Sequence, residues 1–103
     1  MFDTIKKIFG VKTTNYAELV KSGAIILDVR SKGEYAGGHI KGSVNIGVNQ
    51  LHNSLNKWPK NQAIITCCAS GMRSSTARGI LKANGFTKVY NGGSWVSLQS
   101  KIK

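Results

Sequence analysis

The segment AIITCCASGMRSSTARGILKANGF (63–86) determines the fold class. It starts with a continuous apolar run at 63–67, which is typical of a strand buried on both faces. Small and polar residues follow, and then apolar residues at helical spacing up to Asn84-Gly85, a helix-ending pair. A buried strand that leads through a short loop into a helix is the repeating unit of α/β proteins with a parallel sheet.

The rest of the chain repeats this order. The apolar run AIILDV (24–29) predicts a second buried strand, and shorter strands are expected at 43–46 and 88–90. Helices are expected at 15–23, at 31–34, from 48 to near Pro59, at 74–84, and through residues 95–98 after a Gly92-Gly93 turn. The sequence therefore predicts an α/β sandwich with a largely parallel sheet.

The chain has 103 residues, which predicts a single domain. Its 15 Lys and Arg residues against 4 Asp and Glu residues give a formal net charge of +11. Such a field favours anionic partners: nucleic acid, anionic lipid or a small negative substrate. The basic residues are dispersed and no nucleic-acid-binding motif occurs, so we expect no nucleic-acid partner and assign the field to attracting small anions.

The two cysteines, Cys67 and Cys68, are too few for a disulfide framework. His39 and His52 lie far from them in sequence, so neither a metal site nor a cofactor is expected. Residues 1–14 contain no apolar run like that of a signal peptide, and nothing approaches the roughly 20 apolar residues of a membrane span. We therefore expect a cytoplasmic protein with free thiols.

The loop after the 63–67 strand has the composition of an anion site. A loop that leads into a helix N-terminus can direct backbone N–H groups at one point, and Ala69, Ser70 and Gly71 are small enough to let it curl. Arg73 adds a cation with a planar set of donors. These influences lower the pKa of a thiol, so Cys68 is predicted to be a thiolate nucleophile that faces an anion pocket.

Three segments together resemble one family. CASGMR (68–73), followed by Ser, resembles the C-x-x-G-x-R active-site loop of the rhodanese-like sulfurtransferases. DVRSKGEYAGGHIKGSVNI (28–46) and VYNGGSW (89–95) resemble two further segments of that family, and all three occur in the family's order. The resemblance spans most of residues 14–98.

The resemblance implies a rhodanese-like three-layer sandwich, with a single domain over 1–103 and a core at about 14–98. It implies that Cys68 takes a sulfane sulfur from thiosulfate or another persulfide or polysulfide donor, and passes it to cyanide or a thiol. Backbone N–H groups of residues 69–73 would hold the persulfide. The alternative is a sulfur-carrier or docking module with little turnover, whose basic surface binds an acidic sulfur-acceptor protein.

The length of the loop favours sulfur over phosphate chemistry. Four residues lie between Cys68 and Arg73, whereas the related phosphatases have one residue more. The longer loop fits a phosphoryl group, and the shorter one fits a single sulfur atom.

Other residues of these segments have two interpretations each. Cys67 is predicted to face the core at the end of its strand, with a resolving thiol as the alternative. Arg73 either orients the anion or pairs with an acidic residue beneath the loop. Met72 is expected to make the rim of the pocket more apolar.

Asp28 and Arg30 are expected to be buried partners that fix the loop over 37–42. The alternative makes Asp28 a charge that tunes Cys68. His39 is expected to form a structural hydrogen bond in the turn rather than to act as a base, because a thiolate stabilised by a helix terminus needs none.

Overall fold

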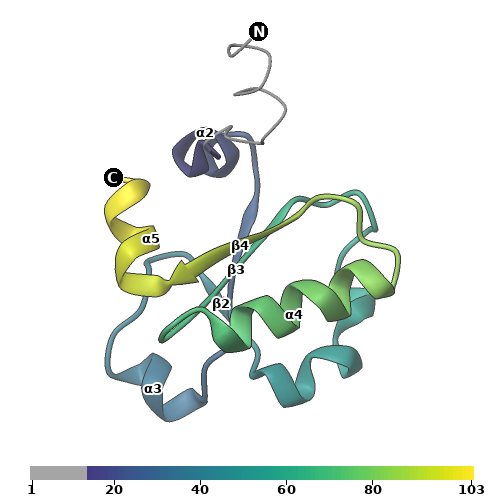
Figure 1. The fold of residues 1–103 in the computed structure, drawn as a ribbon, viewed down its shortest axis with the longest axis horizontal. Helices are drawn as coiled ribbons and strands as arrows, with labels where there is room; N and C mark the ends of the chain where they lie inside the picture. Colours follow the sequence, from purple (N-terminus) through teal and green to yellow (C-terminus); the bar gives the residue numbers. More distant parts are fainter. Residues whose placement is uncertain (1–13) are drawn as a thin grey trace, which may run out of the picture.

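The computed structural model describes residues 14–103, in which four parallel strands form one sheet with the order β2-β1-β3-β4 (Figure 1). The strands are β1 (Ile25–Asp28), β2 (Val44–Asn45), β3 (Ile64–Cys68) and β4 (Val89–Ser94). Every pair of neighbouring strands is parallel. The predicted parallel sheet is therefore confirmed, with its two apolar strands adjacent at the centre.

Helices cover both faces of this sheet. They are α2 (Tyr16–Lys21), α3 (Lys32–Ala36), α4 (Met72–Ala83) and α5 (Trp95–Lys101), with two 3₁₀ helices, η1 (Val48–Asn53) and η2 (Leu55–Lys57). Helix α4 packs with η1 and η2 on one face, and α2 and α5 lie together on the other (Figure 1). The predicted three-layer α/β sandwich is confirmed.

The alternation of side chains along β3 separates the two cysteines. Ile64 and Cys68 belong to the core beneath α4, whereas Ile65 and Cys67 belong to the core beneath α2 and α5. All four side chains are fully buried. Strand β3 runs one residue further than predicted, so that Cys68 rather than Cys67 is its last residue. The prediction that Cys67 faces the core is confirmed.

Other predicted element boundaries were also wrong. The pair Gly92-Gly93 does not form a turn, because β4 continues through both residues to Ser94. A Cβ on Gly92 would lie only 2.9 Å from side-chain carbons of both Ile65 and Leu98, so a glycine is needed where the strand passes this close to its neighbours. Helix α4 begins at Met72 rather than Ser74, with Gly71 as its N-cap.

The segment from 48 to Pro59 forms two short 3₁₀ helices rather than the predicted single helix. Asn, Ser and His residues, which have low helix propensity, separate its apolar positions. The predictions for residues 1–13, namely the absence of a targeting segment and the start of the domain, lie outside the described residues.

Gly47, which precedes η1, is expected to tolerate proline with a gain in stability. Its φ of −58° is one that proline adopts, and among the described residues its N–H has no hydrogen-bond partner. A Cβ there would make only an ordinary contact, 3.7 Å from the carbonyl oxygen of Arg30. We expect Gly47→Pro to raise the free energy of unfolding by about 0.4–1 kcal/mol, because it restricts the unfolded chain.

Urea unfolding of the two proteins measures this difference. Gly42→Pro is the matched control and should destabilise the fold, because Gly42 has a φ of +86° that proline cannot adopt. A Gly47→Pro protein that unfolds at lower urea than the parent would contradict the expectation.

Candidate active site

Cys68 lies at the carboxyl end of β3, where the loop begins that leads into α4. Its Sγ accepts hydrogen bonds from the N–H of Gly71 at 3.0 Å and from the N–H of Ser74 at 3.3 Å. The loop therefore curls around the sulfur as predicted. Within the predicted range of 69–73, Gly71 donates to Sγ, and the second donor, Ser74, lies one residue beyond that range.

Gly71 makes the tight path of this loop possible. Its φ of +107° lies in the left-handed region that other residues rarely adopt, and a Cβ there would lie 3.6 Å from Cα of Gly93 in β4. Ala69 and Ser70 are exposed. Met72 is 78% exposed, so the predicted apolar side chain lies on the surface at the start of α4.

The pKa of Cys68 lies below the ordinary value of a thiol, although burial acts in the opposite direction. Burial raises the pKa, but hydrogen bonds from the hydroxyl and N–H of Ser74 and from the N–H groups of Gly71 and Ser70 lower it by more in total. The loop thus stabilises negative charge on the sulfur, which is what a nucleophilic or persulfide-bearing cysteine needs.

Cys67 has the opposite environment. Burial, with a smaller effect from the charge of Asp28, raises the pKa of Cys67 to about 12. Both cysteines are free thiols, and their side chains point to opposite faces of the sheet. Of the pair, only Cys68 has its pKa lowered, so it is the more easily ionised of the two thiols.

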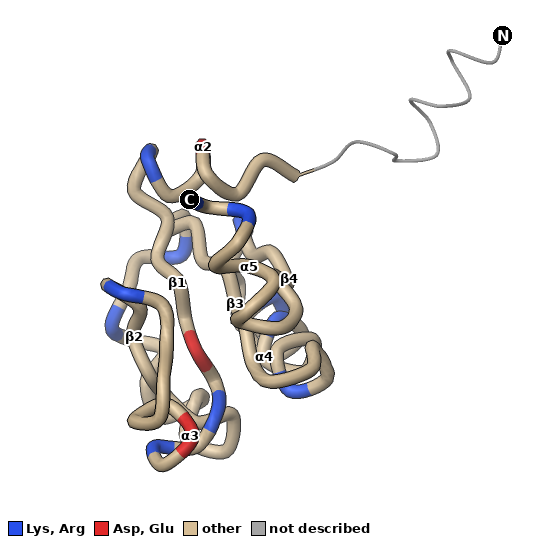
Figure 2. The backbone as a smooth tube through the Cα atoms, turned by 90° about the vertical axis from the view of Figure 1, so that its left-hand side faces the viewer, with Lys and Arg blue, Asp and Glu red and all other residues tan. Residues whose placement is uncertain are grey.

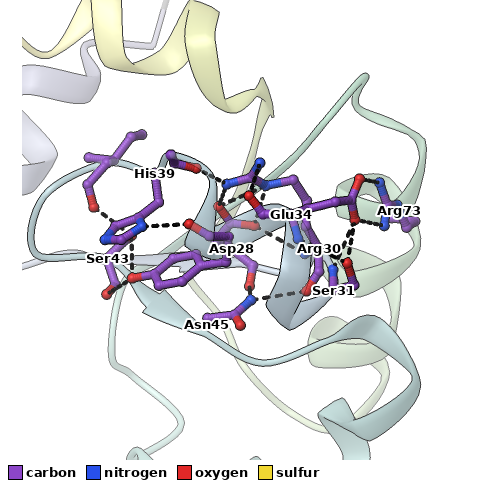
Figure 3. A network of polar contacts seen from close by, with 11 residues as sticks. Asp28, Arg30, Ser31, Glu34, His39, Ser43, Asn45 and Arg73 are labelled. Carbon is purple, nitrogen blue, oxygen red and sulfur yellow. Dashed lines mark hydrogen bonds and ion pairs between the residues drawn. The ribbon is translucent and has the colours of Figure 1, made fainter.

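The guanidinium of Arg73 is paired with Glu34, which lies in α3. Its two terminal nitrogens donate to the two carboxylate oxygens at 2.8 and 3.0 Å (Figure 3). Glu34 also accepts from the N–H and hydroxyl of Ser31, which completes the predicted capping box of α3. Of the two interpretations of Arg73, the structure contains the ion pair, which ties the start of α4 to α3.

The ion pair should respond to pH in one direction. Hydrogen bonds from Arg73 and Ser31 lower the pKa of Glu34 to about 2. A depressed pKa means that Glu34 contributes its full stabilisation above the usual carboxyl pKa and loses it as the pH falls towards 2. We expect the stability difference between the parent and Glu34→Gln to stay constant above about pH 5 and to shrink towards zero at pH 2.

Denaturant unfolding of both proteins at a series of pH values measures this difference. Glu18→Gln is the matched control, because Glu18 lies on α2 and its carboxylate forms no ion pair with a described residue. A Glu34→Gln difference that is independent of pH down to 2 would show that the carboxylate is not bound to Arg73 in solution.

Asp28 and Arg30 form a buried ion pair at the end of β1 (Figure 3). Arg30 donates to both carboxylate oxygens, with the shortest bond at 2.8 Å, and its guanidinium carbon lies 4.7 Å from the ring centroid of Trp95. The guanidinium also donates to the carbonyl oxygens of Glu34 at 3.3 Å and Gly38 at 2.7 Å. These contacts agree with the interpretation of the pair as a support of the 37–42 loop.

His39 lies on the far side of this network from Arg73 (Figure 3). Its Nδ1 is 2.7 Å from the carbonyl oxygen of Tyr35, and the two rings stack with centroids 3.7 Å apart. No contact joins His39 to Cys68. Its geometry is that of a structural hydrogen bond within the turn.

The described residues carry more basic than acidic side chains. Lys and Arg residues lie on elements all around the described chain, whereas Asp and Glu occur only on α2, β1 and α3 (Figure 2). A cavity of about 470 Å³ adjoins Arg73 and includes Lys32, Asn49 and Gln50 in its lining, but not Cys68.

Among residues 14–103, no group of three or more His, Cys, Asp or Glu residues could hold a metal ion, and no helix is long and apolar enough to cross a membrane.

Two polar residues, one that contacts Cys68 and one that contacts the first, were missed by sequence reasoning. Ser74 was assigned to a helix cap, although its place directly after Arg73 in the loop motif could have indicated a role at the sulfur. Asn91 comes from β4, and its Oδ1 lies 2.6 Å from the hydroxyl of Ser74. No local signal marks Asn91, because only the fold brings β4 beside the loop.

Known proteins resemble this chain in sequence and in architecture. The chain is 32% identical to the thiosulfate sulfurtransferase GlpE of Ectopseudomonas mendocina over 74 residues. This match covers 72% of this chain and 68% of GlpE. The chain is 41% identical to the putative sulfur carrier protein YrkF of Bacillus subtilis over 66 residues. This match covers 64% of this chain and 36% of YrkF. The chain spans 54% of the length of a further Bacillus subtilis relative.

The structure of the human single-domain sulfurtransferase TSTD1 superimposes with a TM-score of 0.74 at 27% sequence identity, over 84% of this chain and 90% of that one. The family model of the rhodanese-like domain matches residues 13–100. The parallel sheet, the loop around Cys68 and these matches lead to one conclusion: the chain belongs to the rhodanese-like domain family.

Proposed function

We propose that the protein is a sulfurtransferase that moves a sulfane sulfur from thiosulfate, or from another persulfide or polysulfide donor, to cyanide or a thiol through a persulfide on Cys68. The observation that supports this most directly is the ring of donors around Sγ, which stabilises an anionic sulfur at the head of a helix. The identity with GlpE supports thiosulfate as a donor.

The first half-reaction loads the cysteine. The Cys68 thiolate attacks the outer sulfur of thiosulfate, a new S–S bond forms, and the original S–S bond breaks so that sulfite leaves with its electron pair. The N–H groups of Gly71 and Ser74 already point at Sγ, and the N-terminal end of α4 adds positive potential for the anionic sulfur. The net positive charge of the chain favours the approach of the thiosulfate dianion.

The second half-reaction returns the cysteine to its starting state. Cyanide or a thiolate attacks the outer sulfur of the persulfide, the bond between the two sulfurs breaks, and Cys68 leaves as a thiolate. The same donors that lower the pKa of Cys68 make it a good leaving group. No oxidant, reductant or proton shuttle is required for the transfer to cyanide.

Incubation with thiosulfate followed by intact-mass measurement tests this proposal. We expect the parent to gain one sulfur atom, cyanide to remove it, and Cys68→Ala to prevent the gain. Cys67→Ala is the matched control and should gain the sulfur like the parent. A parent chain that takes up no sulfur from thiosulfate, glutathione persulfide or polysulfide would refute the proposal.

A second candidate is a sulfur-carrier or docking module that exchanges its persulfide with an acidic partner protein and turns over slowly alone. The identity with the putative sulfur carrier YrkF favours it, as does the excess of basic residues. Stable persulfide formation combined with negligible turnover on cyanide and on small thiols would select this candidate over the first.

Met72 is expected to influence which donor is preferred. Its side chain is 78% exposed at the start of α4, next to the residues that surround Cys68. An apolar rim favours an organic persulfide over a bare inorganic anion. We expect Met72→Asn to lower the kcat/KM for glutathione persulfide relative to that for thiosulfate, by about threefold to tenfold. Equal changes for the two donors would contradict this role. Val96→Asn is the control, because Val96 is the other large exposed apolar side chain among residues 14–103.

A further inference from the structure

The cavity that adjoins Arg73 lies beyond the carboxyl ends of neighbouring strands. Its lining comes from the ends of β1 and β2, from the segments that follow them, and from Arg73 in the helix that follows β3. In the strand order β2-β1-β3-β4, the chain passes from β1 outward to β2 and then crosses back to β3. Parallel α/β sheets bind ligands where the strand order reverses in this way, so the fold places the cavity where a ligand is expected.

The cavity adjoins the loop around Cys68, although the sulfur does not line it. Val29 lines the cavity and belongs to the same core cluster as Cys68, and its N–H donates to the carbonyl oxygen of Cys67 at 2.9 Å. Arg73 also lines the cavity, and the next residue, Ser74, donates to Sγ of Cys68. The cavity and the reactive sulfur therefore share one loop.

The size of the cavity exceeds what the smallest substrates need. Its volume of about 470 Å³ lies within the range of roughly 300–1,000 Å³ that is typical of small-molecule sites. Thiosulfate or cyanide would fill only a small part of this space. Three apolar side chains, those of Val29, Ile46 and Val48, contribute to the lining and suit the carbon atoms of a larger molecule.

Asn45 offers a hydrogen-bond acceptor to this space. Its amide nitrogen donates to the carbonyl oxygens of Asp28 and Arg30, both at 3.0 Å (Figure 3). Both amide hydrogens are thereby used, and Oδ1 accepts no hydrogen bond from a described residue. Since no buried side-chain oxygen of the described residues lacks a partner, this oxygen is accessible. Asn45 therefore suits a ligand that carries an N–H group.

Lys32 offers a cation. It is exposed and lines the cavity, and the ion pairs among the described residues are those of Arg30 with Asp28 and of Arg73 with Glu34. Arg73 is thus neutralised by Glu34, whereas no described carboxylate neutralises Lys32. One free ammonium suits one carboxylate of a ligand better than a phosphate dianion, which needs more positive charge.

We propose that the cavity binds the organic part of a carboxylate-bearing peptide thiol, either as the free thiol or as its persulfide. Lys32 binds the carboxylate, and Oδ1 of Asn45 accepts a hydrogen bond from a peptide N–H. The exposed amides of Asn49 and Gln50 supply further polar contacts at the edge of the cavity. This inference rests on the proposed function, because it names the class of thiol that exchanges sulfur with Cys68.

Titration of the protein with S-methylglutathione, followed by amide NMR shifts, tests the proposal. We expect the shifts to gather at residues 45–50 and around Lys32. Lys32→Gln should weaken the binding by about twofold to fivefold, which is the contribution of an exposed ion pair. Lys82→Gln is the matched control, because it removes the same charge from an exposed residue in the last turn of α4 that does not line the cavity. It should leave the binding unchanged.

The diethyl ester of S-methylglutathione tests the cause, because it has no carboxylate for Lys32 to bind. We expect the parent and Lys32→Gln to bind this ester equally. The proposal is overturned if the parent does not bind S-methylglutathione at millimolar concentration. It is also overturned if the two lysine variants weaken binding equally, or if Lys32→Gln weakens binding of the ester as much as that of the acid.

The thioether cannot exchange sulfur with Cys68, so this experiment is separate from the test of sulfur transfer. A chain that binds S-methylglutathione in the cavity but takes up no sulfur from any donor would refute the proposed function. A chain that takes up sulfur but does not bind the thioether would refute the assignment of the cavity alone.

Discussion

Replacement of Cys68 with serine is expected to lower the rate of sulfur transfer from thiosulfate to cyanide by about a thousandfold or more. A serine hydroxyl cannot form a persulfide, and its oxygen is not ionised near neutral pH. The loop donors that now face Sγ, the N–H groups of Gly71 and Ser74, can still bond the smaller oxygen. The fold should therefore survive while the chemistry is lost.

Cys67→Ala separates this effect from a general loss of structure. Cys67 is also fully buried and adjacent in sequence, but it faces the core beneath α2 and α5. We expect Cys67→Ala to lower the stability by about 1 kcal/mol and to leave turnover close to that of the parent. Comparable loss of turnover in both variants would mean that Cys67 takes part in the reaction as a resolving thiol.

The strand–loop–helix arrangement around Cys68 could be predicted from sequence because its signals are local. The apolar run at 63–67 predicts a strand buried on both faces, and the helix that follows ends as expected at Asn84. The capping box at Ser31 and Glu34 was also readable, since both partners lie within one helical turn. In each case, neighbouring residues alone determine the local structure.

The features that sequence reasoning missed depend on residues that are distant in the chain. Gly92 lies inside β4 rather than in a turn, because Ile65 and Leu98 leave no space for a side chain there. Glycine preferences alone cannot distinguish close packing from a turn. The partner of Arg73 was predicted as a type, an acidic residue, but that it is Glu34, 39 positions away, follows only from the fold.

Removal of the Asp28 carboxylate is expected to cause the largest loss of stability among the polar residues of the site. Arg30 is 4% exposed, and Asp28→Ala would leave its guanidinium buried without its anionic partner. Breaking a buried ion pair costs about 3–5 kcal/mol, a large part of the roughly 5–15 kcal/mol that stabilises a typical domain. Denaturant unfolding of the parent and the variant should show this difference.

The double variant Asp28→Leu with Arg30→Met is the test of the cause. It should recover much of the lost stability, because neither residue then leaves a buried charge unpaired.

Asp28→Asn addresses the alternative role of Asp28 as a charge that tunes Cys68. Loss of a nearby negative charge would lower the pKa of Cys68 if Asp28 tuned it, whereas an unchanged titration in a destabilised protein would identify the pair as structural. A stable Asp28→Ala protein would contradict the structural role, and an unchanged titration of Cys68 would contradict the tuning role.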